Sequence, residues 1–445
     1  MAHFSGNIFI IGCGAVAQCF LDILIKNLSI KPSQCIVLDP NIPESISDYR
    51  MQGLNFIQNS ITEKNYSHIL GQYLKKGDIC IDLATGISTI EILSWCHDHQ
   101  IHYINTCLNN WSDQKEPLYN LHTLIQSVIE TWPSNSSTAI LSHGVNPGLV
   151  SSFAKQACLD LAAYVLSHEV HKNSKEIESA LINEEFARLA FLLEITHIHI
   201  SETDTQIIPS ISQNQGTFLN TWSIVEFINE CITKSEIAKG SFTQLLPEGT
   251  IIMGNTVLLP TRAMHTFQQS WCYPELFVGI IPPHDEIYSL SDFFSYSVPN
   301  GQTYRPWVSF VYKPSPAAMA SLLELEQNNF IHPKKFHIMK DEIIDGADTL
   351  GCLLLRDKQP SWWTGSAMTI QESNQITPGH NATITQTASG VLAAFIFIIN
   401  NPNKGVLLPE QLPHSDIINS ARAYLGKFIS TPVPITANDC AFLSS

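Results

Sequence analysis

A tryptophan and two glutamates stand at helical spacing in the middle of the chain. Trp222 precedes Glu226 and Glu230 by about one and two helical turns, so the three side chains could share one face. An indole face beside a carboxylate suits an alkylammonium ion, because a desolvated cation–π contact is worth ~2 kcal/mol. We therefore predict a site for a cationic amine here. A core tryptophan beside surface acids is the alternative.

Two other segments carry acids that fit the same chemistry. Glu202 opens the polar cluster 202–206, which follows a predicted strand over residues 196–201 and is expected at a loop boundary. Asp345 and Asp348 offer two more carboxylates across a turn. We select Glu202 as the carboxylate that would face an ammonium group, although a solvated loop acid is the ordinary interpretation.

A dinucleotide fingerprint lies near the N-terminus. The pattern G-x-G-x-x-A over residues 12–17 includes Gly12, Gly14, Ala15 and Val16, and it follows a short apolar run and opens a helical stretch. Glycines there let backbone N–H groups approach a pyrophosphate at the helix N-terminus. Asp39 ends the next predicted strand, where a carboxylate would bind a ribose 2′-hydroxyl and repel a 2′-phosphate. The pattern therefore favours NAD over NADP.

Later strand ends supply further candidate cofactor contacts. Thr85 follows the apolar run 79–83, and Asn105 and Thr106 close the run 102–105, at the sheet edge where ligands of parallel sheets bind. An ordinary turn is as good an interpretation for each. Gly144 and Asn146 lie between a predicted strand and a helix that begins near residue 149, where the Asn146 amide could face cofactor or substrate.

Histidines at positions 97, 99 and 102 resemble a metal tract, but Asp98 is the only carboxylate among them. No second set of ligands is spaced to match, so we predict no metal. The pair Trp362 and Trp363 is interpreted as packing rather than as an aromatic cage.

Composition limits the partners. The chain has 445 residues, 40 acidic against 24 basic, and a formal net charge of -16, which would repel nucleic acid and anionic lipid and attract cations. Eleven scattered cysteines without a C-x-x-C pair favour reduced thiols in a cytoplasm. The apolar run 391–399 is about half of the ~20 residues that span a bilayer, so we expect no membrane span and no signal peptide.

The order of apolar runs predicts an α/β protein. Runs at 8–11, 35–38, 79–83, 102–105 and 139–141 alternate with helical patterns, which is typical of a Rossmann-type doubly wound parallel sheet. A helix is predicted over residues 175–194, and strands over 196–201, 251–259 and 307–312 lack regular intervening helices. A second, α+β domain is therefore expected. Residues 382–400 read as an apolar helix that ends before Asn401-Pro402.

Taken together, these segments resemble the bacterial homospermidine synthases of the saccharopine dehydrogenase-like group. The resemblance runs nearly end to end and rests on the order and spacing of the fingerprint and of the segments 143–150, 201–206, 220–223, 341–351 and 381–383. It implies a homodimer with an NAD-binding domain at 1–145, a substrate-binding and dimerisation domain at 146–365, and a C-terminal return segment, 366–445, that completes the first domain.

The resemblance also implies a redox-neutral reaction. NAD takes a hydride from one putrescine, a second putrescine displaces ammonia from the resulting imine, and the hydride returns to give homospermidine. By position in matching motifs, Trp222 would stack on the cationic intermediate, and Asn146 would orient the reacting amine. Glu202, Glu230 and Asp348 would anchor ammonium ends. His284 is a candidate proton shuttle, because the ordinary pKa of histidine is ~6.5.

One position differs from the family pattern, and two alternative functions remain open. We expect the family to carry an acid two positions before Trp111, where this chain has Asn109, which puts the preference among diamines in doubt. An NAD(P)-dependent saccharopine- or carboxynorspermidine-type reductase would need arginine or lysine for a substrate carboxylate, whereas the selected motifs are acidic. A non-catalytic NAD sensor would need no acid and tryptophan pocket.

Overall fold

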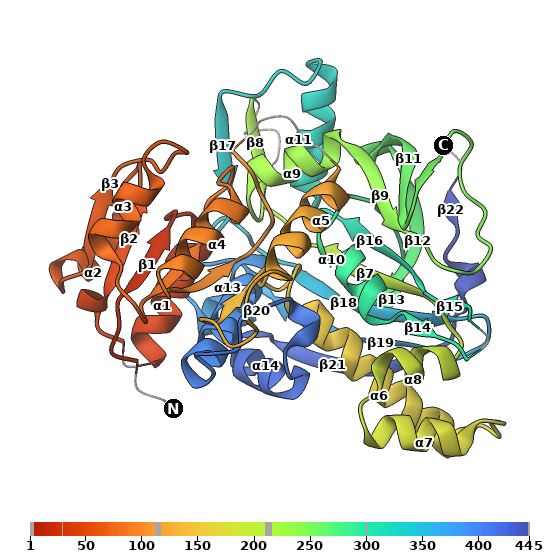
Figure 1. Ribbon diagram of the computed structural model, residues 1–445. Coiled ribbons are helices and arrows are strands. Elements are labelled where there is room, and N and C mark those ends of the chain that lie inside the picture. Colours follow the sequence, from red (N-terminus) through yellow and green to blue (C-terminus); the bar gives the residue numbers. More distant parts are fainter. Residues whose placement is uncertain (1–3, 29, 112–116, 210–215, 300, 444–445) are drawn as a thin grey trace. The chain divides into compact units, whose positions relative to one another are not determined.

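The computed structural model describes residues 4–28, 30–111, 117–209, 216–299 and 301–443. The chain forms two compact units, and each takes segments from distant parts of the sequence (Figure 1). Unit 1 comprises residues 1–149, 373–380 and 384–424, and unit 2 comprises 150–372, 381–383 and 425–445.

Unit 1 is built on a parallel sheet of seven strands in the order β20-β6-β5-β4-β1-β2-β3, the doubly wound order in which a nucleotide binds at the strands' carboxyl ends. The strands are β1 (Ile8–Ile11), β2 (Cys35–Asp39), β3 (Asn55–Gln58), β4 (Ile79–Asp82), β5 (His102–Asn105), β6 (Ala139–Ile140) and β20 (Val406–Leu407). The five runs predicted for this sheet are all strands. The strand β3 was not predicted, because its sequence, Asn-Phe-Ile-Gln, places only two apolar residues between polar ones.

Helices cover this sheet. They are α1 (Ala15–Asn27), α2 (Ser47–Met51), α3 (Tyr66–Tyr73), α4 (Thr89–Asp98), α5 (Leu118–Ile129), α13 (Ala382–Asn400) and α14 (His414–Ala421). The first two residues of α13, Ala382 and Thr383, belong to unit 2. The apolar core between strands and helices includes Phe9, Leu70, Ile92 and Tyr103, all fully buried. Within the residues predicted as a return segment, β20 extends this sheet beside β6, whereas the chain from Leu425 onward belongs to unit 2.

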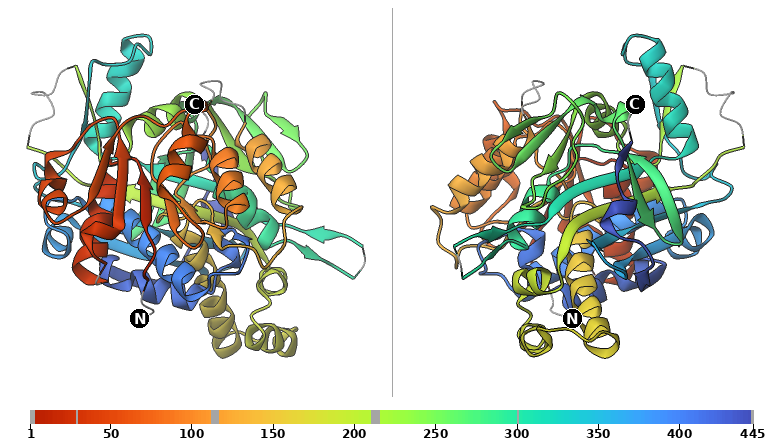
Figure 2. Two further views of the ribbon diagram at one scale, coloured as in Figure 1. Left: turned by 60° about the vertical axis from the view of Figure 1, so that its left-hand side comes forward. Right: turned by 90° about the vertical axis from the view of Figure 1, so that its right-hand side faces the viewer.

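Unit 2 contains a mixed sheet of eleven described strands, whose long curved members are clear in the right-hand view of Figure 2. Its central order is β10-β11-β9-β16-β7-β18-β19-β21, with β12, β13 and β22 attached. These strands are β7 (Ile195–Asp204), β9 (Lys234–Ala238), β10 (Ile251–Met253), β11 (Thr256–Arg262), β12 (Phe267–Cys272), β13 (Glu275–Ile280), β16 (Trp307–Lys313), β18 (Ala347–Arg356), β19 (Ser361–Thr369), β21 (Lys427–Val433) and β22 (Phe442–Leu443). Only the β16–β7 pairing joins two of these strands in parallel, which fits the predicted α+β unit.

Shorter elements complete unit 2. Two small sheets pair β14 (Tyr296–Ser297) with β15 (Thr303–Tyr304) and β8 (Thr217–Asn220) with β17 (Lys335–Ile338). The helices are α6 (Leu149–His168), α7 (Ser174–Ile182), α8 (Phe186–Leu192), α9 (Ile224–Ile232), α10 (Glu286–Phe293), α11 (Pro316–Gln327) and α12 (Ile370–Ile376), of which α6 and α12 each cross the boundary between the units.

Two expectations about element boundaries were wrong. The helix predicted over 175–194 is two helices, α7 and α8, because Glu184 takes a positive φ of 51° that ends the first. The strand predicted over 251–259 is a hairpin of β10 and β11, since Gly254 and Asn255 form a two-residue turn between them.

Two helices, α6 and α13, are long and apolar enough to cross a membrane by length and composition alone. About two thirds of the relevant stretch of α6 and over three quarters of that of α13 are buried inside the protein, as in the core helices of a globular fold.

Candidate functional site

Three carboxylates of unit 2 lie on one face of its central sheet. Side chains alternate along a strand, so Glu202 and Asp204 of β7 point to the same side. Asp348 of β18 pairs with Asp204 in the antiparallel register, and Leu350 pairs with Glu202. Cross-strand neighbours share a face, which brings the three acids together. Glu202 and Asp204 were expected at a loop boundary, and this was wrong, because the ladder with β18 continues as far as Asp204.

These acids are withdrawn from water. Glu202 is 6% exposed, Asp204 1% and Asp348 0%. Burial raises the pKa of Asp204 to about 6. Burial also raises the pKa of the Asp348 carboxyl well above its usual range, and the nearby charges of Glu202 and Asp204 raise it further. A solvated loop acid is therefore the wrong description of this cluster.

Asp204 and Asp348 differ in their hydrogen bonds. One Asp204 oxygen accepts from the backbone N–H and the side-chain amide of Gln206, at 2.9 and 3.1 Å, and the other accepts from the Thr221 hydroxyl at 2.6 Å. Neither Asp348 oxygen has a hydrogen bond of ordinary geometry within the described residues, although the Thr383 hydroxyl lies close enough to lower its pKa. Asp348 is thus the acid of the cluster whose two carboxylate oxygens make no hydrogen bond of ordinary geometry within the described residues.

The predicted partner of Asp348 does not join it. Asp345 is exposed in the turn before β18, where Gly346 adopts a φ of 103°. A Cβ on Gly346 would lie 2.1 Å from the Thr205 carbonyl oxygen, so only glycine lets this turn pack against the segment after Asp204. The turn therefore sets the start of β18 against the end of β7.

Trp222 is held by aromatic neighbours at the edge of the acid cluster. Its indole N–H donates to the Tyr312 hydroxyl at 3.1 Å, and its ring meets Phe227 edge to face at 5.7 Å. Tyr312 pairs with Glu202 in the β16–β7 register, and the charges of Glu202, Asp204 and Asp348 help raise its pKa. The indole is thus tied to the strand beside the acids.

We predicted that Trp222 shares a helical face with Glu226 and Glu230. This was wrong, because Trp222 lies before the start of the helix α9. Trp222 precedes the N-cap residue Ser223, whose hydroxyl accepts from the Glu226 N–H at 3.4 Å. Trp222 and Phe227 then form the hydrophobic staple that accompanies such a cap. Glu230, half-buried on α9, lies one turn beyond Phe227 and close enough to Cys231 to raise its pKa.

His284 lies in the loop between β13 and α10 and is 6% exposed. Its ring packs on Phe310 at 4.8 Å, and Phe310 stacks on Tyr312 at 5.6 Å. Since Phe310 and Tyr312 are two residues apart on β16, His284 lies over the same sheet face as the acids. Unit 2 therefore brings together four of the six predicted catalytic residues around one face of its sheet, namely Glu202, Trp222, His284 and Asp348, and it also contains Glu230 on α9.

Sequence reasoning did not select Asp204 or Tyr312. A signal for Asp204 was present, because Ile198, Ile200, Glu202 and Asp204 continue one alternating pattern and so predict one face. Tyr312 gave no signal, because its contact with Trp222 joins residues 90 positions apart.

The opposite face of the same strands is a packed core. The Trp363 indole is fully buried and donates to the Ser201 hydroxyl at 2.9 Å. Gly351 pairs with Gly365 behind the acids, and a Cβ on Gly351 would lie 2.5 Å from the Trp363 ring. Trp363 is a packing residue, as predicted, and it supports the strands that carry Glu202 and Asp348.

In unit 1 the fingerprint forms a strand–turn–helix. Gly12 has a φ of 89°, and a Cβ there would lie 3.0 Å from the Ala84 backbone nitrogen. At Gly14, the N-cap of α1, a Cβ would meet nothing within 4 Å, so the backbone at this helix N-terminus is open to a ligand. Ala15 and Val16 form the first turn of α1, which carries no acid.

Asp39 is placed beside this turn. One of its oxygens accepts from the Cys13 N–H at 2.7 Å, and the other accepts from the Asn41 N–H at 2.8 Å. A groove of about 640 Å³ runs past Asp39, and its lining includes Gly12, Thr85 and Trp111. The carboxyl ends of β1, β2 and β4 thus meet at one groove, as expected for a dinucleotide site.

Both the oxygen and the nitrogen of the Asn105 side-chain amide form hydrogen bonds at the edge of the sheet. Its amide oxygen accepts from the Ser142 N–H at 2.8 Å, and its NH₂ group donates to the Thr89 hydroxyl and the Cys107 carbonyl oxygen. Thr106, half-buried, lies beside Gly144. Asn105 therefore positions the neighbouring loops of unit 1.

Gly144 and Asn146 lie in a tight turn of unit 1. The Gly144 N–H donates to the Pro147 carbonyl at 2.7 Å, across a cis Asn146–Pro147 bond. A Cβ on Gly390 of α13 would lie 1.9 Å from the Gly144 carbonyl oxygen, so this helix contacts the turn backbone directly. His143 is buried, and its Nδ1–H donates to the Gly390 carbonyl at 2.9 Å. Burial lowers the pKa of His143 to about 4, which keeps the ring neutral.

The histidines of residues 97–102 form no metal site among the described residues. His97 stacks on Trp132 and His99 stacks on Trp95, each with ring centroids 4.0 Å apart. His102 is a buried residue of β5.

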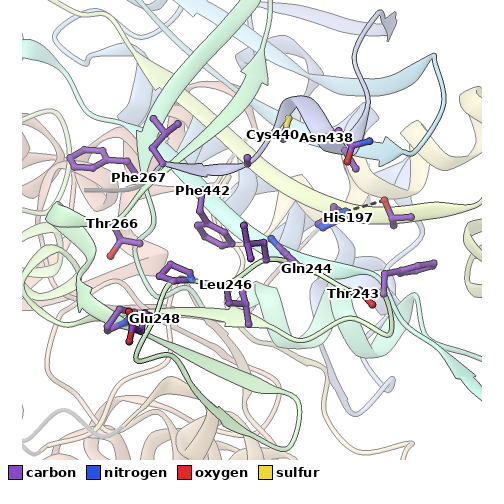
Figure 3. Close-up of a pocket in the computed structure, with 18 of the residues that line it drawn as sticks. His197, Thr243, Gln244, Leu246, Glu248, Thr266, Phe267, Asn438, Cys440 and Phe442 are labelled. Atoms are coloured by element: carbon purple, nitrogen blue, oxygen red, sulfur yellow. Dashed lines mark hydrogen bonds between the residues drawn. The ribbon is translucent and has the colours of Figure 1, made fainter.

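Unit 2 also has a cavity of about 960 Å³ that contains none of the predicted site residues (Figure 3). Gln244, Leu246 and Phe442 gather around it in the close-up, with His197 on another side. His197 points to the face of β7 opposite Glu202, because the two residues are five positions apart. This cavity is separate from the acid cluster.

Comparisons with known proteins match nearly the whole chain. Residues 8–140 match the family described as the saccharopine dehydrogenase NADP binding domain, and residues 144–429 match the saccharopine dehydrogenase C-terminal domain. A homospermidine synthase of Blastochloris viridis is 29% identical over 441 residues, which is 95% of this chain and 90% of that protein.

Two solved structures share the fold. A homospermidine synthase from Legionella pneumophila, crystallised with NAD, is 30% identical with a TM-score of 0.87, covering 97% of this chain and 92% of that one. Saccharopine dehydrogenase from Saccharomyces cerevisiae is 11% identical with a TM-score of 0.52, covering 96% and 100%, and shares the fold alone.

Proposed function

This chain belongs to the saccharopine dehydrogenase family, in the branch of the homospermidine synthases, and we propose that it condenses two putrescine molecules into homospermidine with release of ammonia. In this proposal an NAD held at Gly14 and Asp39 would supply the acceptor and the donor of one hydride, so the reaction would consume no redox equivalent.

The observation that carries the proposal is the buried carboxylate cluster of Glu202, Asp204 and Asp348. Asp204 and Asp348 make no ion pair with a lysine, arginine or histidine anywhere in the described chain. Buried acids without a cation suit a substrate that brings its own positive charge. Putrescine is a dication near neutral pH, because both of its amines have the high pKa of alkylamines. A substrate with a carboxylate would be repelled here.

Trp222 supports the same choice of substrate. A flat indole stabilises an alkylammonium or iminium ion through cation–π attraction of ~2 kcal/mol when water is excluded. The hydrogen bond to Tyr312 and the packing on Phe227 support a fixed indole orientation. Trp222 thus stabilises the cationic carbon–nitrogen centre, and the apolar surroundings limit hydrolysis of the imine.

The remaining predicted residues have positional roles in the proposal. Glu202 and Asp348 anchor ammonium ends of the diamine, and Glu230 binds a further ammonium from α9. Asn146 orients the reacting amine. His284 shuttles protons between the site and solvent, which fits its place over the acid-bearing face of the sheet.

The cofactor of this proposal is NAD, although the family description names NADP. The residues fit a dinucleotide: the open backbone at Gly14 suits a pyrophosphate, and Asp39 suits a ribose 2′-hydroxyl and disfavours a 2′-phosphate. When bound, NAD supplies the hydride acceptor and donor. Thr85, in the lining of the same groove, is a further proposed contact.

We also propose a cytoplasmic homodimer. The eleven cysteines are all free thiols, which fits a reducing compartment. Exposed apolar side chains on the edge strand β10, namely Ile251, Ile252 and Met253, support self-association, because an uncovered apolar edge favours pairing. Light scattering of the purified protein tests the dimer, and a monomeric mass would contradict it.

The test of function is incubation with putrescine and a trace of NAD, followed by mass spectrometry and an ammonia assay. Homospermidine and ammonia in equal amounts without net NADH are expected. Asp348→Asn should lower the rate ~100-fold or more, because a charged hydrogen-bond partner is lost, whereas exposed Asp345→Asn three positions away should not. Accumulation of NADH, or activity only with a carboxylated amine, would favour the reductase instead.

A further inference from the structure

Asp204 and Asp348 lie directly opposite each other in the β7–β18 ladder, and both are almost fully buried. We infer that they form a proton-sharing pair: without substrate the pair holds one proton, and an entering ammonium group displaces it. This rests on the proposed function, since the displacing group is the ammonium end of the diamine. It assigns to Asp204, which the proposed function leaves without a role of its own, a part in keeping the proton on Asp348.

The geometry permits one negative charge on the pair. Directly opposed residues of an antiparallel ladder have Cα atoms about 4.5–5.5 Å apart, and their side chains share a face. Two like charges at such a distance away from water cannot both persist, so one carboxyl retains its proton. No basic side chain within the described residues forms an ion pair with either acid.

Hydrogen bonds decide which acid is charged. Asp204 accepts three hydrogen bonds, two from Gln206 and one from Thr221, and donors of this kind stabilise an ionised carboxylate. Asp348 has no partner of ordinary geometry for either oxygen among the described residues. The proton therefore resides on Asp348. The pKa shifts agree with a proton on Asp348, because the pKa of Asp348 is raised well above its usual range whereas that of Asp204 is raised to about 6.

Among the described residues, the groups that the register and the pKa shifts place beside the pair are acidic or neutral. Glu202 precedes Asp204 on the same face of β7, and Tyr312 faces it from β16. The Cys272 thiol of β12 packs with Trp363 on the opposite face of the sheet; burial raises its pKa, and the charges of Glu202 and Asp348 raise it further. Thr383 contributes a hydroxyl beside Asp348. Since neither Asp204 nor Asp348 forms an ion pair among the described residues, a cationic ligand would supply the charge that this pair lacks.

A second buried acceptor beside the pair also points to a ligand that donates. Asn220 is 0% exposed, and its amide oxygen has no hydrogen-bond partner within the described part of the chain. Its neighbour Thr221 is the residue that donates to Asp204. An alkylammonium group carries three N–H donors, the chemistry that two uncommitted buried acceptors would recognise.

Asp348 would release a proton when the ammonium group binds and take one up when the amine becomes neutral. When R–NH₃⁺ binds, Asp348 loses its proton to solvent and the ion pair of ammonium and carboxylate forms. When the amine must be neutral to lose a hydride or to attack the imine, its N–H bond breaks and the proton returns to Asp348, giving R–NH₂ and the carboxylic acid. Asp204 remains charged throughout and holds the Asp348 affinity for the proton high.

Calorimetry of the protein loaded with NADH tests this, because putrescine then binds without being oxidised. Titrations at pH 7 in two buffers of different ionisation enthalpy count the protons released. About one proton per diamine is expected for the wild type and for the exposed control Asp345→Asn. Less release is expected for Asp204→Asn, in which Asp348 loses one of the charges that raise its pKa, and none for Asp348→Asn, which has no carboxyl to lose the proton. No release from the wild type, or equal release from Asp204→Asn, would overturn the pair.

Infrared spectroscopy tests the pair without any diamine. The difference spectrum between the wild type and Asp348→Asn at pH 7 should show the carbonyl band of one protonated carboxylic acid, and this band should weaken in Asp204→Asn, while circular dichroism confirms that both variants fold. Absence of that band from the wild type contradicts the pair even if homospermidine is made. Presence of the band and of proton release without homospermidine would leave the pair standing and refute the proposed function.

Discussion

The indole N–H of Trp222 donates to the hydroxyl of Tyr312 at 3.1 Å, which links the entry of α9 to the strand that lies beside the buried acids. Tyr312 itself is 1% exposed and stacks on Phe310. The orientation of the proposed cation-binding indole thus depends on a strand residue far away in the sequence.

Replacement of Tyr312 by phenylalanine should lower kcat/KM for putrescine about 5- to 20-fold, because the loss of a buried hydrogen bond of about 1–1.5 kcal/mol releases the Trp222 indole. Steady-state kinetics measures this. Tyr304→Phe is the matched control, since the Tyr304 hydroxyl donates to the Ile195 carbonyl in the same unit. Both variants should lose thermal stability, but only Tyr312→Phe should lose activity. Equal kinetics in the two variants would refute the positioning role.

The raised pKa of Asp204 has a consequence for stability. Its carboxyl has an ordinary pKa of 3.8 and a pKa of about 6 in the folded protein, so the folded state binds the proton more tightly. Stability from this group is present below pH 3.8 and is lost as the pH rises through about 6, on the order of 1–3 kcal/mol. Asp204→Asn should therefore become stabilised relative to the wild type between pH 4 and pH 7.5. Urea unfolding at both pH values measures the difference, and a gap that does not change with pH would count against the assignment.

Gly346→Ala should destabilise the protein by more than 2 kcal/mol, because a Cβ would meet the Thr205 carbonyl at 2.1 Å. Gly379→Ala separates this clash from backbone strain, since Gly379 has a positive φ of 84° with nothing within 4 Å of its Cβ position. The control should cost only about 1–2 kcal/mol. Chemical unfolding compares the two, and a smaller loss at position 346 than at 379 would show that the turn can relax.

Asp39→Asn should weaken NAD binding about 10-fold and reduce the preference for NAD over NADP by a similar factor, because the charge that bonds a ribose hydroxyl and repels a 2′-phosphate is removed. Fluorescence titration with NADH and NADPH measures both affinities. Asp48→Asn, an exposed acid in the same unit, should change neither. An unchanged preference in Asp39→Asn would place cofactor selection elsewhere in the groove.

Local patterns predicted the first unit well. The fingerprint, the strands at 8–11, 35–38 and 102–105 and the helix at 382–400 depend on periodicity and turn chemistry that neighbouring residues determine. The seven-stranded order and the pairing of β20 with β6 join segments over 260 residues apart, and no local pattern contains such information.

The acid site shows where local reasoning fails. Glu202 and Asp204 were placed at a loop because polar residues usually end a buried strand, whereas pairing with β18 extends β7 through them. Trp222 was assigned to the α9 face from its spacing, whereas Ser223 caps the helix after it. Tertiary partners, in each case, override the local preference.

Hydride recycling is the central claim, and deuterated putrescine tests it most directly. With putrescine that carries deuterium on both carbons bonded to nitrogen, the deuteride leaves one carbon and returns to the same carbon after ammonia has gone. The account predicts homospermidine that retains all of its deuterium, even in the presence of excess unlabelled NADH, as measured by mass spectrometry. Product that has lost deuterium at that carbon, or deuterium that accumulates in free NADH, would contradict a hydride kept within one catalytic cycle.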